Sequence, residues 1–380
     1  MKILHVCLAS HYTEGMTYQD NQLSEQNAKD GHDVVVVADC FVYKGSDLVE
    51  VPEEDIYLPS GVRLIRFKYD KILNNTVSSK IRKVSRLKTL IESYLPDVIL
   101  FHGVAGWEML TVAKYKKNNP KVKLYIDSHE DRHNSGTFWF SLFFQYKLFN
   151  NIIVKRISSY VDKFLYLSFE SKEFLNKIYG LKDDCLEFYP LGGNVIEPKR
   201  REKYESVIRE RHKLAINDIL IVHSGKLDSP KKTEQLLKAF FRVKSENLRL
   251  FIIGSIPNHM EPLLIPLIRR DARVIFLGWK SGDELIQYLS AADLYFQPGT
   301  QSATMQNAIC CSCPVALYPY PSHEPYIQGN GFFVKNENDY VDVFNTLTRS
   351  PHLISQMKKA SYKIANDLLD YKKLAARLYE

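Results

Sequence analysis

Two lysines five positions apart follow a short apolar run in the segment HSGKLDSPKK. Lys226 comes directly after Gly225, and Lys231 follows a turn at Pro230. Two cations near a strand end can point at one anionic group, and the glycine lets that group approach the backbone. A pair of solvated surface lysines is the alternative. The spacing favours a phosphate-binding site.

The segment FQPGTQSATMQN predicts a second anion-binding element. Gly299 ends an apolar run, and Ser302 is of a type that favours the N-cap position of a helix. The helix would begin with free backbone amides and the positive end of its dipole facing a ligand. We expect these amides to belong to Ala303, Thr304 and Met305.

Three further residues extend this expected site. Asn307 lies one turn into the helix, where its amide can bind a hydroxyl group beside the phosphate. Gly254 and Gly278 end two other apolar runs, where they leave room for a flat ligand or simply terminate the strand. Together with the two lysines, this pattern favours a nucleoside diphosphate as the ligand.

The segment DSHEDRHNSG carries a third group of chemically active side chains. Asp127, His129 and Asp131 alternate, so they share one face of an extended backbone, and Glu130 and His133 lie close by. These residue types can bind a metal ion. A structural loop is another possibility, and a polar active-site loop without metal is the interpretation that we favour.

The polar loop ASHYTEGMTYQD follows the first apolar run. Gly15 and Met16 lie in it shortly before an expected helix. Backbone amides in such a loop can face an anion or a sugar. The alternative is a plain turn.

Parallel strands must position these residues. Short runs rich in Val, Ile and Leu alternate with helix-length segments such as 19–29, 78–94, 233–243, 283–291 and 304–311. This alternation predicts a parallel sheet covered on both faces. The expected strands lie at 3–8, 33–38, 62–67, 97–103, 123–129 and 163–168, and then at 219–225, 248–254, 274–278, 294–299 and 314–318. Ligands bind outside the carboxyl ends of the strands in such sheets.

The strand pattern restarts once, so we expect two doubly wound, Rossmann-like α/β domains facing each other across a cleft. The first spans residues 1–190 and the second 214–350. The polar stretch 191–213 is predicted to be a linker. Helices at 351–380 are expected to pack on either domain, and crossing back to the first is one option.

The chain has 380 residues and a net charge of +7, which is unevenly distributed. Residues 63–88 hold nine Lys or Arg and one acid, and residues 138–157 are rich in aromatic side chains. A solvated basic face with a buried helix is one interpretation. The other is contact with an anionic membrane surface. No recognised nucleic-acid motif accompanies the charge, so we do not expect nucleic acid as a partner.

The compartment follows from the N-terminus and the cysteines. No signal peptide or membrane-spanning apolar run is evident, and no histidine stands at a metal-binding spacing from Cys310, Cys311 and Cys313. We expect reduced, packed thiols in a cytoplasmic protein. If the basic stretch binds lipid, the protein would be peripheral at the inner membrane face.

Seven segments, in their order along the chain, resemble the retaining glycosyltransferases of the GT-B fold, family 4 type. They are GHDVVVVA, PDVILFHG, DSHED, FLYLSFESKEFL, YPLGGNV, GKLDSPKKTEQLLKAF and MQNAICCSCPVA. The resemblance covers nearly the whole length.

This resemblance implies transfer of a sugar from a nucleotide-diphosphate sugar, expected to be a UDP-sugar, to a glycan or lipid-linked acceptor. It implies retention at the anomeric carbon, no metal or other cofactor, and a role in bacterial cell-surface polysaccharide assembly. Lys226 and Lys231 match positions that bind the diphosphate, His129 matches a histidine near the transferred sugar, and Gly15 matches the glycine loop over the donor.

The chain departs from the family at two glutamates that usually stand eight residues apart. Gly299 and Asn307 occupy these positions, and no acid lies between residues 295 and 317. Three alternatives therefore stay open: a silent subunit that supports a partner enzyme, a sugar-nucleotide epimerase, and a metal-dependent hydrolase centred on DSHEDRH.

Overall fold

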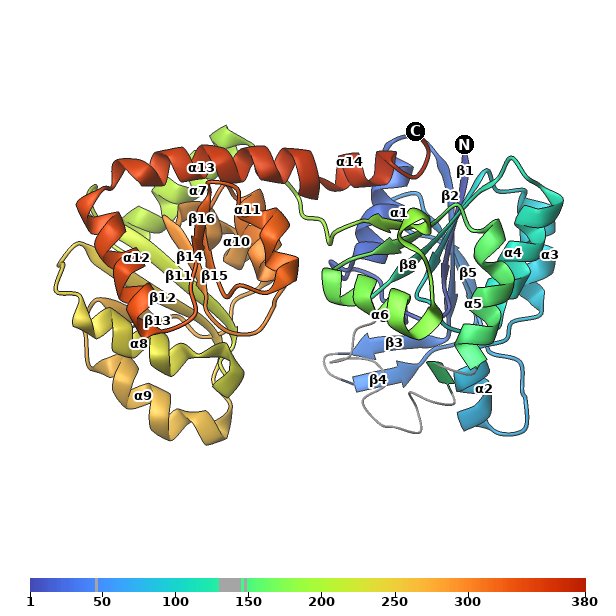
Figure 1. Ribbon diagram of the computed structural model, residues 1–380, viewed down its shortest axis with the longest axis horizontal. Coiled ribbons are helices and arrows are strands. Elements are labelled where there is room, and N and C mark those ends of the chain that lie inside the picture. The colour runs from blue at the N-terminus through green and yellow to red at the C-terminus, as the bar shows by residue number, and fades with distance from the viewer. Residues whose placement is uncertain (45–46, 130–144, 147–148) are drawn as a thin grey trace. The chain divides into compact units, whose positions relative to one another are not determined.

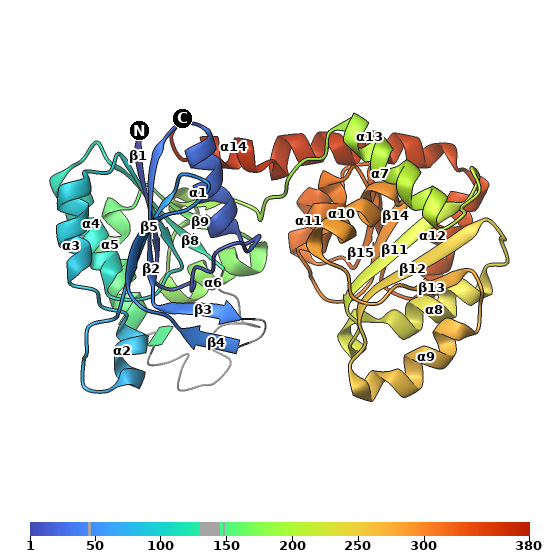
Figure 2. The same ribbon diagram turned by 180° about the vertical axis from the view of Figure 1, so that it is seen from behind.

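The computed structural model describes residues 1–44, 47–129, 145–146 and 149–380. It divides into two compact units, one of Met1–Pro190 with Tyr371–Glu380 and one of Leu191–Asp370. Each unit is an α/β layer structure around its own sheet (Figures 1 and 2). The expected fold class, two Rossmann-like α/β domains, is confirmed.

The first unit contains an eight-stranded sheet in the order β10-β9-β8-β7-β1-β2-β6-β5. All neighbours are parallel except β5, which is antiparallel to β6. Six central strands follow the order 3-2-1-4-5-6, which is typical of nucleotide-binding α/β folds. The strands are β1 (Lys2–Cys7), β2 (Asp33–Asp39), β5 (Glu54–Tyr57), β6 (Arg63–Phe67), β7 (Val98–His102), β8 (Lys123–Ser128), β9 (Lys163–Tyr166) and β10 (Leu186–Phe188).

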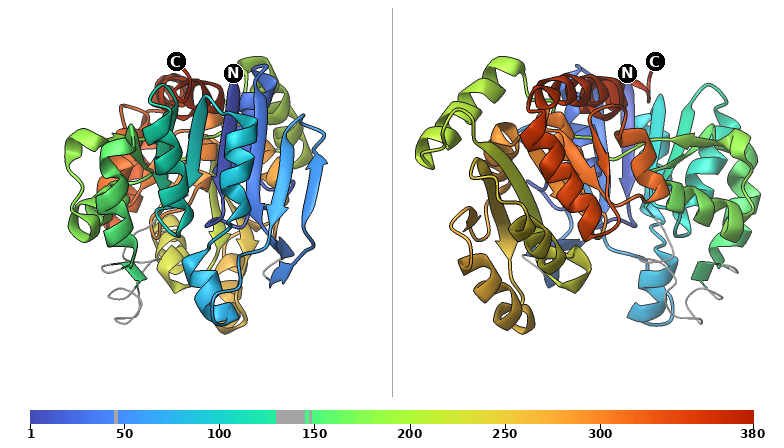
Figure 3. Two further views of the ribbon diagram at one scale, coloured as in Figure 1. Left: turned by 90° about the vertical axis from the view of Figure 1, so that its right-hand side faces the viewer. Right: turned by 60° about the vertical axis from the view of Figure 1, so that its left-hand side comes forward.

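Alternate strand residues of the first unit feed two cores, one on each face of its sheet. Leu4, Val35 and Ile99 pack with α3, α4, α5 and α6, whereas Ile3 and Val34 pack with α1 and α14. The left panel of Figure 3 shows α3 and α4, in cyan and teal, lying across the strands. The helices are α1 (Gln19–Lys29), α2 (Asn75–Ile81), α3 (Arg86–Tyr94), α4 (Glu108–Asn118), α5 (Asn151–Ile157), α6 (Phe169–Tyr179) and α14 (Tyr371–Ala376).

A small hairpin of β3 (Phe41–Lys44) and β4 (Asp47–Glu50) follows β2. It lies at the end of the first unit opposite the start of β1, which is the end where the parallel strands terminate (Figure 1). The sequence analysis missed this hairpin, because its four-residue strands are half-exposed and lack a continuous apolar run.

The second unit contains a six-stranded, fully parallel sheet in the order β13-β12-β11-β14-β15-β16, again 3-2-1-4-5-6. Its strands are β11 (Ile219–Lys226), β12 (Leu248–Ser255), β13 (Val274–Phe276), β14 (Leu294–Gln297), β15 (Val315–Leu317) and β16 (Gly331–Phe333). Its helices are α7 (Pro198–Arg211), α8 (Thr233–Arg242), α9 (Glu261–Arg269), α10 (Gly282–Ala291), α11 (Thr304–Cys310), α12 (Glu337–Arg349) and α13 (His352–Ile364). In the right panel of Figure 3, α12, in orange-red, lies over the strands.

One boundary differs from the sequence prediction, and the expected return of the C-terminal helices to the first unit is confirmed. The stretch 191–213 is not a free linker, because α7 occupies most of it and packs against α10 within the second unit. Of the C-terminal segment 351–380, α13 belongs to the second unit and only α14 belongs to the first. The polar composition of α7 hid this packing, since Ile208 is its one fully buried side chain.

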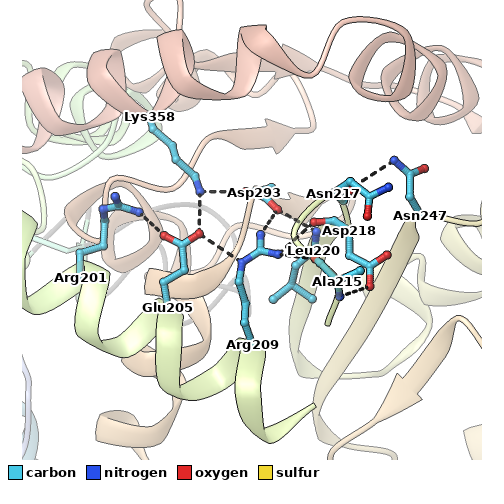
Figure 4. A network of polar contacts seen from close by, with 10 residues as sticks. All are labelled: Arg201, Glu205, Arg209, Ala215, Asn217, Asp218, Leu220, Asn247, Asp293 and Lys358. Carbon is cyan, nitrogen blue, oxygen red and sulfur yellow. Dashed lines mark hydrogen bonds and ion pairs between the residues drawn. The ribbon is translucent and has the colours of Figure 1, made fainter. Parts of the chain in front are cut away.

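Ion pairs secure α7 in place of apolar contacts. Asp293, just before β14, is buried and accepts from Arg209 of α7 at 2.9 Å and from Lys358 of α13 at 2.8 Å (Figure 4). Glu205 of α7 pairs with Arg201, Arg209 and Lys358. This network joins the first and last helices of the second unit.

Candidate functional site

Lys231 lies beneath the carboxyl ends of three neighbouring segments of the second sheet. It ends a short 3-10 helix, Ser229–Lys231, after β11. A Cβ atom at Gly225 would lie 2.6 Å from Lys231 Cε, and a Cβ at Gly299 would lie 2.8 Å from Lys231 Cα. Gly254 packs on Gly225 in the same way. Glycine at positions 225 and 299 lets the backbone of β11 and of the loop after β14 approach this lysine closely.

No acid among the described residues forms an ion pair with the Lys231 ammonium group. The residue is 5% exposed, and among the described residues it makes no ion pair or side-chain hydrogen bond. Burial lowers its pKa, and Asp228 only partly opposes this effect. A buried, unpaired cation costs stability. Such a charge at a strand end, in the crevice where doubly wound sheets bind ligands, is suited to an anion.

Lys226 stands in a different environment from Lys231. It is the last residue of β11, is exposed and lies in register with Ser255. The structure therefore provides one buried and one solvent-exposed cation where the sequence analysis expected an equivalent pair.

The loop after β14 differs in detail from the expected anion-binding helix start. The N-cap of α11 is Ala303 and not Ser302. Ser302 Oγ accepts from the Thr304 amide at 3.3 Å, and Ser302 O accepts from the Met305 amide at 3.1 Å. Of the three amides expected to be free, only that of Ala303 lacks a partner among the described residues. The helix start is therefore a weaker anion-binding element than predicted.

Gly299 packs so closely that no side chain fits in this backbone. A Cβ there would lie 2.1 Å from Pro230 O, and the neighbouring Thr300 amide donates to the same carbonyl at 3.2 Å. This contact gives a physical reason for the absence of a glutamate at this position. It also joins the loop after β14 to the Lys231 segment.

Asn307 and Gly278 occupy separate positions around the second sheet. The half-buried Asn307 has a side-chain amide with no hydrogen-bond partner among the described residues, and its Oδ1 would lie 3.5 Å from a Cβ at Gly193. Gly278, after β13, has a left-handed φ of +66°, faces open space and accepts from the Gly254 amide. Asn307 thus keeps its capacity to bind a hydroxyl group.

His129 lies in the first unit, just after β8. Its side chain is 46% exposed, and its Nε2 lies 3.6 Å from Asp127 Oδ1. Asp127 is buried and also accepts from His102 Nδ1 at 2.6 Å and from the Gly103 amide at 2.8 Å. Burial alone would raise the pKa of Asp127, but His102 and His129 hold it well below its usual value. Asp127 is therefore an ionised carboxylate beside His129.

A buried chain of polar groups continues behind Asp127. His102 Nε2 lies 3.0 Å from His5 Nδ1, and His5 Nε2 lies 2.9 Å from Asn27 Oδ1. The two rings stack with centroids 5.3 Å apart. Burial lowers the pKa of His5 to about 3, and His102 adds to this effect, so His5 is neutral. The sequence analysis missed these residues, although each histidine interrupts an apolar run (ILHVCL and DVILFHG) and so gave a usable signal.

A third missed histidine, His223, lies within β11. Its Nδ1 donates to Phe296 O at 2.8 Å, and Thr233 Oγ1 donates to its Nε2 at 2.9 Å. Burial lowers the pKa of His223 to about 4. It joins β11, β14 and the start of α8, and thereby supports the segment that carries Lys231.

The loop with Gly15 and Met16 is tied down by its neighbours in the first unit. Gly15 has a φ of +72° and faces open space, and the Met16 amide lies 3.4 Å from Thr13 O. Asn21 Nδ2 donates to Thr13 O, and Arg66 donates to Tyr12 O. The exposed tip is therefore held on a fixed base.

The structure describes only part of the metal-binding set that DSHEDRH could form. Among the described residues, no group of three or more His, Cys, Asp or Glu is arranged to hold a metal ion. Glu130, Asp131 and His133, which completed the expected set, lie outside the described residues.

The basic stretch 63–88 is less positive than its sequence indicates. Five of its nine cations pair with acids, four of which come from residues 50–55 and one of which is Glu92. The buried Arg66 also pairs with Glu14. Lys71, Lys80, Arg82 and Lys83 make no ion pair among the described residues. Most of the aromatic side chains of the stretch 138–157 lie outside the described residues.

Within the part of the chain that the structure describes, no helix has the length and apolar character needed to span a membrane. The three clustered cysteines, Cys310, Cys311 and Cys313, are buried and free, as expected of packing residues.

The family described as "Glycosyl transferases group 1" matches residues 205–364. No curated protein sequence matches the chain significantly. Solved structures match nearly its whole length. Anabaena Alr3699/HepE in complex with UDP has a TM-score of 0.68 at 15% identity, covering 99% of this chain and 98% of that chain.

Two other matches are similar in extent. The sucrose-phosphate synthase tll1590 of Thermosynechococcus elongatus has a TM-score of 0.67 at 16% identity, covering 99% of this chain and 97% of that one. WaaG, a glycosyltransferase involved in lipopolysaccharide biosynthesis, has a TM-score of 0.60 at 16% identity, covering 99% of both chains. The chain therefore has the GT-B fold, and its second unit carries a glycosyltransferase group 1 domain.

Proposed function

We propose that the protein transfers a sugar from a UDP-sugar to a glycan or lipid-linked acceptor, with retention at the anomeric carbon and without a metal ion. The donor would bind the second unit and the acceptor the first. The observation that carries the proposal is Lys231, a buried cation that makes no ion pair among the described residues and packs against Gly225 and Gly299. The similar fold of Anabaena HepE, which was solved with UDP, supports the choice of nucleotide.

The chemistry follows from where charge develops. Negative charge grows on the leaving diphosphate as its bond to the sugar breaks, and a preorganised cation stabilises that charge. Lys231 would supply it, with Lys226 and the Ala303 amide as further donors. The diphosphate can accept the proton of the acceptor hydroxyl, so the step needs no strong protein base. Asn307 would bind a hydroxyl group of the donor.

The wider role that we propose is bacterial cell-surface polysaccharide assembly, with peripheral contact to the inner membrane face. WaaG, a structural neighbour, is a glycosyltransferase of lipopolysaccharide biosynthesis, and this supports the class of acceptor. A silent subunit is a second candidate, because Gly299 stands where the family usually has an acid and its packing leaves no room for one.

The test measures whether UDP raises the melting temperature and whether Lys231 is required. A ligand that binds only the native state stabilises it. UDP should raise the melting temperature of the wild type but not of Lys231→Met. Lys238→Met is the matched control, because Lys238 is an exposed lysine of α8 that pairs with Glu234.

Release of UDP from a UDP-sugar in the presence of a glycoside acceptor then separates an enzyme from a silent subunit. Binding without turnover would favour the silent subunit. If another nucleoside diphosphate stabilises the wild type and UDP does not, the donor carries a base other than uracil. No response to any nucleoside diphosphate would contradict the proposed donor site.

A further inference from the structure

A histidine and a buried carboxylate form a pair at the carboxyl ends of β1 and β2. His11 Nδ1 lies 2.6 Å from Asp39 Oδ2, and the Asp39 side chain is fully buried. Tyr69 donates to the same oxygen at 2.7 Å, and the Phe41 amide donates to Oδ1 at 3.2 Å. Since the carboxylate can only accept, His11 Nδ1 carries the proton and the other ring nitrogen, Nε2, can accept one hydrogen bond.

Arg66 fixes the backbone around this pair. The buried Arg66 donates through the same Nη1 to Tyr12 O at 3.0 Å and to Asp39 O at 3.1 Å. It thereby joins the two segments that carry His11 and Asp39. His11 itself has a left-handed φ of +55°, which is uncommon for a residue other than glycine. Strain of this kind persists where the surroundings enforce it, as they do at binding sites.

Two aromatic side chains of β3 form a wall beside His11. Phe41 and Tyr43 share one face of the strand, and both are half-buried. Their ring centroids lie 5.9 and 6.3 Å from that of His11, each in an edge-on arrangement. Thr13 Oγ1 accepts from the Tyr43 amide at 3.0 Å, which fixes the wall against the loop that carries His11.

His11 Nε2 is available to a ligand. Among the described residues this nitrogen has no hydrogen-bond partner, and the side chain is 22% exposed. A polar atom held in place beside a half-exposed aromatic wall is the usual composition of a small-molecule site.

We propose that His11, Phe41 and Tyr43 form a subsite for an uncharged sugar ring of the acceptor. The inference rests on the proposed glycosyl transfer and assigns residues to its acceptor. His11 Nε2 would accept a hydrogen bond from a sugar hydroxyl, and the apolar C–H face of the ring would pack on Phe41 or Tyr43. Asp39 acts through His11 and is a positioning residue.

The charges around the subsite favour a neutral ligand over a phosphate. Asp39 and Glu14 are the acids near it, and the nearby Arg66 is occupied by Glu14, Glu54 and two backbone carbonyls. A phosphate would therefore meet the Asp39 carboxylate, and Arg66 is not free to offset the repulsion. A hydroxyl group can donate to His11 without this repulsion.

The test uses methyl glycosides of glucose, galactose, mannose and N-acetylglucosamine, each as the α and β anomer. Their binding at millimolar concentration is followed by saturation-transfer difference NMR with saturating UDP present. We expect at least one to bind the wild type and to bind His11→Asn and Phe41→Ala about tenfold more weakly, the effect of one lost hydrogen bond or apolar contact. Asparagine tolerates the left-handed backbone and can still donate to Asp39.

Asp39→Asn should also weaken glycoside binding, because it no longer orients His11. Tyr57→Ala is the matched control, since Tyr57 of β5 is 73% exposed and lies outside the subsite. The control should bind as the wild type does. All variants should keep the UDP-dependent rise in melting temperature, which reports the second unit.

The possible outcomes separate the two proposals. The subsite is overturned if no glycoside binds the wild type, or if His11→Asn and Phe41→Ala bind like Tyr57→Ala. It is also overturned if His11→Asn weakens UDP-sugar affinity alone, because His11 would then contact the donor. If glycoside binding depends on His11 but UDP does not stabilise the protein, the acceptor subsite stands. The proposed UDP-sugar donor is then rejected.

Discussion

His5 Nδ1 and His102 Nε2 lie 3.0 Å apart in the interior of the first unit, so one of them must donate and the other accept. Asp127 accepts a hydrogen bond from His102 Nδ1, which therefore carries a proton. If His102 is neutral, its Nε2 is an acceptor, and His5 Nδ1 must donate to it. His5 Nε2 then carries no proton and must accept a hydrogen bond from Asn27 Nδ2. If Asn27 presents Oδ1, His102 must carry both protons and pair with Asp127 as an imidazolium.

Both arrangements leave Asp127 negative and direct it at His129. Asp127→Asn should therefore slow transfer about tenfold or more, while His129→Ala should cost roughly a hundredfold, the low end for a positioned catalytic group. If Asp127 acts through His129, the double variant should be no slower than His129→Ala alone. The measurement is kcat for all four proteins. Additive losses would mean that Asp127 serves the fold and not His129.

Buried neutral histidines should make the protein sensitive to mild acid. The pKa of His5 is lowered to about 3 and that of His223 to about 4, against about 6.5 in the unfolded chain. Below pH 6.5 the unfolded state binds protons that the folded state cannot, so stability is fully present above pH 6.5 and falls as pH drops toward 4. Urea unfolding between pH 7.5 and 4.5 measures this slope.

His5→Gln removes one of these titrating groups and should flatten the slope of stability against pH. His259→Gln is the control, because His259 is exposed. An equal slope in wild type and His5→Gln would show that other groups dominate the acid sensitivity.

Most strands of the two sheets could be predicted because they form apolar runs, whereas the short strands β3, β4, β5, β10 and β16 were missed. The run 33–38 and the helix 19–29 match β2 and α1 closely. Helix α7 could not be recognised as packed, because its contacts are ion pairs between residues far apart, such as Arg209 with Asp293. Contacts at such separations leave no local pattern in a single sequence.

The sequence predicted where the site residues lie along the chain, but not how buried they are or what they contact. The sequence placed Lys231 at a strand end, but its burial depends on Gly225 in β11 and Gly299 after β14, two positions that are far apart in the sequence. The His11–Asp39 pair was missed for the same reason. The two residues lie 28 positions apart and meet only because β1 and β2 are parallel neighbours.

Lys231→Met should stabilise the unliganded protein while abolishing its response to UDP. The variant replaces a buried, unpaired charge with an apolar side chain of similar length, which relieves a desolvation cost. We expect the free energy of unfolding to rise by about 1 kcal/mol or more and turnover to fall tenfold to a hundredfold, since a charge-assisted hydrogen bond contributes roughly 1.5–3 kcal/mol. Loss of stability in Lys231→Met would mean that the lysine has an internal partner.

Asp293→Ala should destabilise the second unit strongly. It leaves Arg209 and Lys358 without their shared carboxylate and the Leu220 amide without its acceptor. Breaking a buried pair costs about 3–5 kcal/mol, and the partial exposure of both cations reduces this to roughly 2–3 kcal/mol. Asp183→Ala is the control, because Asp183 forms an exposed pair with Lys172, and its free energy of unfolding should stay close to that of the wild type. Similar denaturation midpoints for the two variants would contradict the role of the network in Figure 4.

Membrane contact, if it occurs, should depend on the four unpaired cations of the basic stretch. Leu73, which is 85% exposed, lies among Lys71, Lys80 and Lys83 along the chain and would add apolar contact. Each cation near an anionic surface contributes about 1 kcal/mol. Changing Lys71, Lys80 and Lys83 to Gln should therefore weaken binding to phosphatidylserine vesicles at low salt about a hundredfold in a sedimentation assay.

The matched control changes Arg63, Lys68 and Lys88 to Gln, three cations that pair with Asp55, Glu50 and Glu92. Both triple variants lower the net charge by three, so a protein attracted only by its net charge would lose binding equally in both. A local patch predicts that the control keeps most of its affinity, because its cations are already neutralised by carboxylates. Failure of the wild type to sediment with anionic vesicles at low salt would leave the stretch as a solvated face and favour a soluble glycan as the acceptor.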